Sequence, residues 1–127
     1  MNPINIKPFE ILNNWQQNLN EKNLSGVLKL YDTRCVLIPT FSSEILTEHE
    51  KIKEYFVKVI EVQKGKVEFQ PNSISEQQVR ENMFLISGNY FFHLMEKENI
   101  PARFSFLVNL LNENPILHHH SSRSIRN

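Results

Sequence analysis

The chain has 127 residues, enough for one domain that buries a core without disulfides or metal staples. Lysine plus arginine total 14, as do aspartate plus glutamate, so the chain lacks the basic surplus on which nucleic-acid binding draws. The N-terminal stretch "MNPINIKPFEILNNW" has neither a long apolar region nor a small-residue cleavage site. We therefore expect a single cytoplasmic domain over residues 1–127, without nucleic-acid or membrane partners.

The first third of the chain has helical periodicity. Apolar residues recur at helical spacing over Phe9–Asn20, just after Pro8, and this pattern predicts an amphipathic helix. A second, shorter helix is predicted from the apolar spacing of Leu24–Tyr31, and Asn23 has the residue type of its N-cap.

A strand and a third helix follow. The short apolar run Cys35–Ile38 predicts a strand that ends at Thr40, with Cys35 as a reduced core thiol because no second cysteine accompanies it. The segment Thr47–Glu50 has the form of a capping box, and the residues behind it form one apolar face of a helix: Ile52, Tyr55, Phe56, Val59 and Ile60.

After Gly65 the pattern becomes extended. Val67 and Phe69 predict a short strand, and "QPNSISEQQ" behind it is rich in turn residues. Three longer strands are predicted at Asn82–Met95, Ala102–Leu111 and Ile116–Ser122, with turns at Glu96–Asn99 and Asn112–Asn114. Helices followed by a mostly antiparallel meander indicate an α+β fold, in which helices cover one face of a strongly curved sheet and leave a cone-shaped pocket.

The segment His118-His119-His120-Ser121-Ser122 is the most distinctive in the chain. Side chains alternate along a strand, so we expect His118, His120 and Ser122 on one face and Leu117, His119 and Ser121 on the other. Three adjacent histidines therefore cannot bind one metal ion, and a zinc site would need further ligands from elsewhere. The run is also shorter than a usual affinity tag and continues an apolar segment.

Three segments together carry a family resemblance. "ARFSFLVNLLNENPILHHHSS", with "VLIPTFSS" and "IKEYFVKVI", resembles the small NTF2-like proteins related to the association domain of calcium/calmodulin-dependent protein kinase II. Within these it looks most like the iota-class carbonic anhydrases, whose hallmark is a terminal His-His-Ser-Ser. The likeness runs from Trp15 to Ser122. It implies a cone-shaped α+β fold, a homodimer formed through the sheet, and reversible hydration of CO2 to bicarbonate.

The resemblance also implies site residues. Substrate would lie among the hydroxyls of Thr40, Tyr55 and Ser121, which are the catalytic candidates, with Ser122 as the second choice of serine. Arg103 of "ARFSF" matches a recurrent arginine of the pocket strand and would bind bicarbonate.

Two further residues are substrate-binding candidates. His119 shares a face with Ser121, and its usual pKa of about 6.5 suits a proton relay. Tyr90 lies in "SGNYFF" and is a candidate either for the core or for the pocket. Family members are described both as metal-free and as metal-assisted. We expect no cofactor, with zinc or manganese as the alternative, and a rate well below that of zinc enzymes.

Two other functions stay open. A non-catalytic NTF2-like module would bind a small molecule or mediate oligomerisation. An isomerase or hydratase of the SnoaL or ketosteroid-isomerase type would need a pocket carboxylate as general base, and the motif segments offer only Glu54, on a different helix azimuth from Tyr55.

Overall fold

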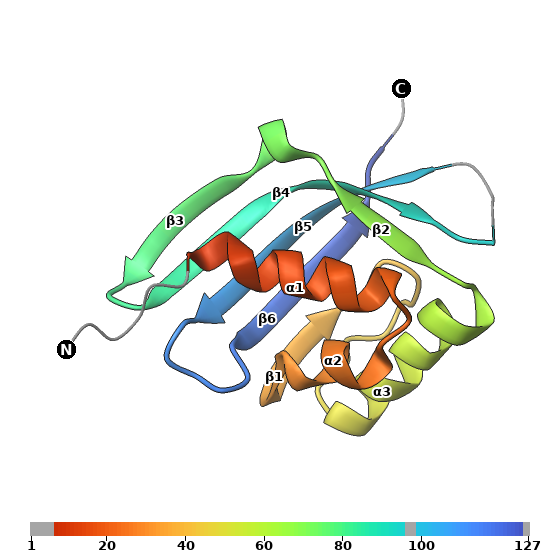
Figure 1. Ribbon diagram of the computed structural model, residues 1–127, viewed down its shortest axis with the longest axis horizontal. Helices are drawn as coiled ribbons and strands as arrows, with labels where there is room; N and C mark the ends of the chain where they lie inside the picture. The colour runs from red at the N-terminus through yellow and green to blue at the C-terminus, as the bar shows by residue number, and fades with distance from the viewer. Residues whose placement is uncertain (1–6, 96–98, 126–127) are drawn as a thin grey trace.

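Three helices lie on one face of a six-stranded sheet in the computed structural model, which describes residues 7–95 and 99–125 (Figure 1). The helices are α1 (Pro8–Asn20), α2 (Leu24–Lys29) and α3 (His49–Val57), and a π-helical turn, Lys58–Val62, continues α3. The strands are β1 (Tyr31–Ile38), β2 (Lys66–Phe69), β3 (Ser75–Arg80), β4 (Met83–His93), β5 (Ile100–Asn109) and β6 (Ile116–Arg123). Within the described residues, no helix has both the length and the apolar character needed to cross a lipid bilayer.

The strand order explains how the end of the sequence reaches the centre of the molecule. Strands follow the order β1-β6-β5-β4-β2, and β3 also pairs with β4. All pairs are antiparallel except β1 with β6, which run parallel. Strand β6 therefore lies between β1 and β5, with hydrogen-bonded neighbours on both edges. The expected α+β arrangement of helices on a curved sheet is confirmed.

Several local predictions are also confirmed. The side chain of Asn23 caps α2, because its Oδ1 accepts a hydrogen bond from Gly26 N at 3.0 Å. Cys35 is a free, buried thiol, and burial raises its pKa to about 12. The predicted strands after Gly65 match β2, β4, β5 and β6 within a few residues.

Three details differ from the prediction, and a fourth lies outside the described residues. Tyr31 begins β1 instead of ending α2. Glu48 is the N-cap of α3 and its side chain makes no capping bond, so the predicted capping box is wrong. Strand β3 was expected to be turn, because all six of its residues are exposed and no apolar alternation reveals it. The turn predicted at Glu96–Asn99 falls mainly on residues 96–98, which lie outside the described residues.

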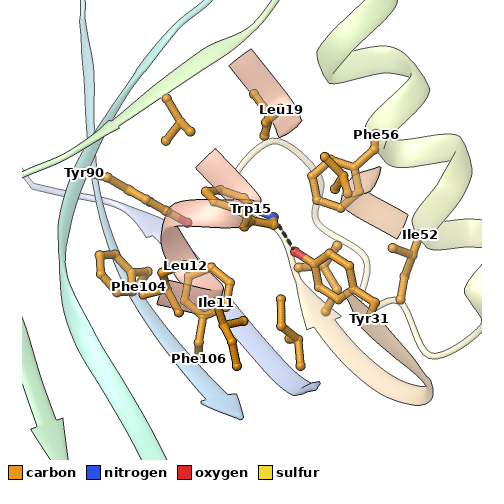
Figure 2. Close-up of a cluster of buried hydrophobic side chains, with 14 of the residues drawn as sticks. Ile11, Leu12, Trp15, Leu19, Tyr31, Ile52, Phe56, Tyr90, Phe104 and Phe106 are labelled. Atoms are coloured by element: carbon orange, nitrogen blue, oxygen red, sulfur yellow. Dashed lines mark hydrogen bonds between the residues drawn. The ribbon is translucent and has the colours of Figure 1, made fainter. Parts of the chain in front are cut away.

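The core lies between α1 and the inner face of the sheet (Figure 2). Trp15 is its centre: the indole packs at ring-centroid distances of 5.4 to 5.9 Å against Phe69, Tyr90 and Phe106. Fully burying one side chain of this kind contributes about 1.5–3 kcal/mol. The aromatic core therefore fills the space between α1 and the inner face of the sheet.

Candidate active site

Strand β6 carries two polar side chains into the core. His119 is 2% exposed and Ser121 is 4% exposed, and the sheet alternation places both on the helix-covered face. A β-bulge precedes them, because Val108 pairs with Ile116 while Leu107 pairs with His118. Leu117 is the extra residue of this bulge and is only half-buried, so its predicted place on the inner face with His119 is not supported.

Three hydroxyl groups meet near the C-terminal end of β6, on the buried face of the sheet. Tyr90 Oη donates a hydrogen bond to Ser121 Oγ at 2.6 Å, and Ser121 Oγ is hydrogen-bonded to Thr40 Oγ1. Thr40 follows β1, Tyr90 lies on β4 and Ser121 lies on β6, so the cluster joins three segments that are far apart in the sequence. The parallel pairing of Leu37 and Ile38 with β6 is what brings Thr40 beside this strand.

The His119 ring continues the hydrogen-bonded network into the core. Its Nε2 lies 3.1 Å from Tyr90 Oη, and its Nδ1 lies 2.8 Å from Tyr31 Oη. The Tyr31 hydroxyl in turn accepts a hydrogen bond from Trp15 Nε1 at 3.0 Å, the dashed line in Figure 2. Phe106 stacks on the imidazole at a centroid distance of 3.7 Å and an interplanar angle of 17°. The ring is therefore fixed by contacts at both nitrogens and on one face.

A small cavity opens beside the hydroxyl cluster. It has a volume of about 10 Å³ and is lined by Trp15, Leu37, Pro39, Thr40, Tyr55, Phe56, Val59, Tyr90, Phe92, His119 and Ser121. A space of this size holds about one water molecule. The three residues predicted to be catalytic, Thr40, Tyr55 and Ser121, thus line one cavity, and so do the candidates His119 and Tyr90.

Tyr55 stands between this cavity and a larger depression at the mouth of the cone. Its hydroxyl accepts a long hydrogen bond from Phe41 N at 3.4 Å. The outer depression has a volume of about 360 Å³ and shares Tyr55 and Val59 with the cavity. We call it the vestibule, and its lining includes the charged residues Glu44, Lys51, Glu54 and Lys58.

Burial keeps the titratable groups of the cavity neutral. Removal from water raises the pKa of Tyr55 and of Tyr90 above the usual value for a phenol. Burial lowers the pKa of His119 well below that of a free imidazole, and the neighbouring His118 and His120 lower it further. The lowered pKa of His119 does not support a proton relay that titrates near the usual imidazole value, because burial disfavours the charged ring.

Two predicted substrate-binding residues lie on the opposite face of the sheet. Arg103 is paired in register with Ser122, and both line an open groove together with His120. Alternation explains this position, because the neighbours Ala102 and Phe104 are buried on the inner face. Arg103 and Ser122 therefore do not reach the cavity, and of the two serines it is Ser121 that lines it.

The histidine-rich segment does not form a metal site. Among the described residues, no three His, Cys, Asp or Glu side chains gather in a way that could hold a metal ion. His120 is exposed on the outer face, whereas His119 is buried on the inner face. The residues present do not fit a zinc or manganese ion, and we assign no chemical step to one.

Sequence reasoning missed Trp15 and Tyr31 as members of the polar network. Trp15 was assigned to the apolar face of the first helix, and Tyr31 to the end of the second. The available signal was chemical: buried tryptophan and tyrosine usually pair their polar hydrogen, so each needs a partner in the core.

Comparisons with known proteins bear on the fold. No family model matches the chain, and no curated protein matches it in sequence. Among solved structures, a candidate calcium/calmodulin dependent protein kinase II association domain from Xanthomonas campestris is similar, with 26% identity and a TM-score of 0.81. The match covers 92% of this chain and 85% of that one.

Two more distant structures have the same architecture. An NTF-2 like protein of unknown function from Shewanella oneidensis is 17% identical with a TM-score of 0.70, over 89% of this chain and 93% of that one. A candidate dehydratase from the NTF2-like family of Streptomyces avermitilis is 7% identical with a TM-score of 0.77, over 92% and 93%. The chain has the NTF2-like α+β cone fold.

Proposed function

We propose that the protein catalyses the reversible hydration of CO2 to bicarbonate in the cavity lined by Thr40, Tyr55 and Ser121. One observation carries the proposal: four hydroxyl side chains from distant segments, those of Thr40, Tyr55, Tyr90 and Ser121, border a water-sized cavity whose other walls are mainly apolar. The resemblance of the His-His-Ser-Ser segment to iota-class carbonic anhydrases supports the same reaction.

The chemistry follows from the lining. CO2 is small and apolar, but the cavity has room for about one water-sized molecule, so we propose that the attacking water occupies the cavity and that CO2 lies beside it at the vestibule end, near Tyr55. A water oxygen attacks the carbon and forms the new C–O bond, one C=O π pair moves onto oxygen, and the water loses a proton. Thr40 and Tyr55 orient the water and donate to the oxygen on which charge develops, and Ser121 is hydrogen-bonded to Thr40 and holds it in place.

The proton must leave the cavity through water. Bulk water has a pKa of about 15.7, and no group that lines the cavity is a strong base. The vestibule, which adjoins the cavity at Tyr55, is the route by which we propose that the proton and bicarbonate leave. The absence of a strong base predicts a rate far below that of zinc enzymes. The proposal includes no cofactor, a homodimer formed through the sheet, and a cytoplasmic location.

The same lining favours a second candidate, a binding module without catalysis. No carboxylate lines the inner cavity among the described residues, and Glu44 and Glu54 lie outside it in the vestibule. A module that binds a small neutral or anionic molecule needs no base. An isomerase or dehydratase acting on a ring-sized substrate does not fit the inner cavity, because about 10 Å³ cannot hold one, and it would have to use the vestibule of about 360 Å³ beside Tyr55.

Stopped-flow CO2 hydration with a pH indicator, on protein treated with chelator, tests the proposal. Thr40→Val removes one hydroxyl with little change in shape, and His120→Gln on the outer face is the matched control. We expect activity above the spontaneous rate in wild type and control, and a loss of about 100-fold in Thr40→Val. No activity, with or without added zinc or manganese, refutes the proposal. Stabilisation by bicarbonate without turnover supports the binding module instead.

A further inference from the structure

We infer that Tyr31, held by Trp15, is a positioning residue that sets the direction of the hydrogen bonds in the site and keeps His119 in the Nε2–H tautomer. The statement about the tautomer stands on hydrogen-bond geometry alone. Its importance for turnover rests on the proposed function.

The direction begins at the indole. Trp15 Nε1 carries a hydrogen and has no lone pair to share, so it can only donate, and Tyr31 Oη must be the acceptor at 3.0 Å. Tyr31 is 1% exposed, which removes water as a partner for its own hydroxyl hydrogen. Within the described residues, the acceptor in range is His119 Nδ1 at 2.8 Å. The Tyr31 hydrogen therefore goes to Nδ1.

The tautomer of His119 follows from this bond. A neutral imidazole has one donor nitrogen and one acceptor nitrogen, so an accepting Nδ1 requires the hydrogen on Nε2. Nε2 then donates to Tyr90 Oη at 3.1 Å. The hydroxyl hydrogen of Tyr90 is left for Ser121 Oγ at 2.6 Å, and Ser121 in turn can donate to Thr40 Oγ1.

The opposite tautomer satisfies fewer groups. With the hydrogen on Nδ1, His119 would donate to Tyr31, and the buried Tyr31 hydroxyl hydrogen would have no acceptor. Nε2 would then also compete with Ser121 for the hydrogen of Tyr90. A buried donor without a partner is disfavoured more than a buried lone pair without one. Each donor from Trp15 to Ser121 finds an acceptor only when the hydrogen bonds all point from Trp15 toward Thr40.

This direction limits what the network can do. Both nitrogens of His119 are occupied, so the ring supplies a fixed hydrogen-bond donor to Tyr90 and is not a base for water in the cavity. The hydrogen-bonded network also ends at the Trp15 indole, which cannot accept a hydrogen bond, so the network offers no path for a proton into the core. A proton released at Thr40 must therefore leave toward the vestibule.

Long-range ¹H–¹⁵N correlation spectra of the histidine rings test the inference directly. The His119 signals are assigned by their loss in His119→Gln. We expect wild type to show a protonated Nε2 and an unprotonated Nδ1 that accepts a hydrogen bond, with the same pattern between pH 6 and pH 8. A protonated Nδ1, or an averaged mixture of the two tautomers, overturns the inference.

A pair of variants separates hydrogen bonding from packing. Tyr31→Phe removes one oxygen, and we expect the Nδ1 signal to lose its hydrogen-bonded position and the Nε2–H population to fall. Trp15→Phe removes far more volume and also the indole donor, but the Tyr31 hydroxyl hydrogen still has His119 Nδ1 as its acceptor in range, so we expect the tautomer to persist. A tautomer that changes in Trp15→Phe and not in Tyr31→Phe contradicts the inference.

Activity measurements separate this inference from the proposed function. In Tyr31→Phe we expect kcat to fall about tenfold with little change in KM, which is the lower end of the effect of removing the hydrogen-bond partner that orients a metal-bound histidine. His120→Gln is the control for both readouts. If the tautomer behaves as expected in wild type and Tyr31→Phe while wild type has no hydration activity, the inference stands and the proposed function fails.

Discussion

The Tyr90 hydroxyl links His119 to Ser121, and its removal has a calculable cost. In Tyr90→Phe the ring keeps its packing against Trp15, Phe92 and Phe104. The hydroxyl's bond to Ser121 is lost, at about 1 kcal/mol, and the buried His119 nitrogen loses its partner, at about 1–3 kcal/mol. We expect a total loss of about 3 kcal/mol in the free energy of unfolding.

Thermal and urea unfolding measure this loss. For a chain of this length, about 3 kcal/mol corresponds to a fall of about 10 °C in Tm, and the m-value in urea should stay unchanged. Tyr55→Phe is the matched control, because its hydroxyl interacts only with backbone groups, accepting a long hydrogen bond at 3.4 Å from Phe41 N and interacting with the backbone of Thr40. We expect that variant to lose only about 0.5 kcal/mol.

The two tyrosine variants should also differ in activity relative to stability. Under the proposed function, Tyr55→Phe loses hydration activity by about 100-fold while it keeps nearly all of its stability. Tyr90→Phe loses both. Equal destabilisation of the two variants, or a neutral Tyr90→Phe, refutes the hydrogen-bond reasoning given above, whatever the activities turn out to be.

Three further predictions concern stability and reactivity. The free energy of unfolding should fall as the pH drops below about 6.5, by up to about 1.4 kcal/mol per pH unit, because the unfolded chain protonates His119 whereas the lowered pKa of the buried ring keeps it neutral in the folded state. Urea titrations at several pH values measure this dependence, and His119→Gln should lose the part that His119 contributes. Gly65→Ala should lower the free energy of unfolding by about 1–3 kcal/mol, measured by thermal unfolding, because the new Cβ would stand 2.8 Å from the Val59 carbonyl oxygen. Gly88→Ala should lower it less, because its new Cβ would meet the end of a flexible isoleucine side chain at 2.9 Å. Cys35 should resist thiol reagents in the native protein and react in denaturant, and rapid native labelling would contradict its burial and raised pKa.

Alternation along strands was the most informative pattern in the sequence. It separated His119 and Ser121 from His120 and Ser122 without any knowledge of the neighbours of β6, and the structure bears out that separation. The same reasoning explains the error at Arg103. The family resemblance predicts Arg103 as a bicarbonate-binding residue, but strand alternation places it on the outer face, opposite the buried side chains Ala102, Phe104, Phe106 and Val108.

The long-range contacts of the site could not be read from the sequence. Thr40 meets Ser121 only because β6 pairs in parallel with β1, and a local pattern does not reveal strand order. Tyr31 was missed for a related reason, because its position beside His119 depends on the same pairing. Local patterns predicted which residues face the core, and strand order decides which of those residues meet.

The central position of β6 determines when the site can form during synthesis. Thr40 and Ser121 are separated by 81 positions, so at about 5–20 residues per second the ribosome adds Ser121 roughly 4–16 s after Thr40. Until then β1 lacks its neighbour β6 and presents an open edge that another chain can pair with. No fragment that stops short of β6 can therefore contain the site.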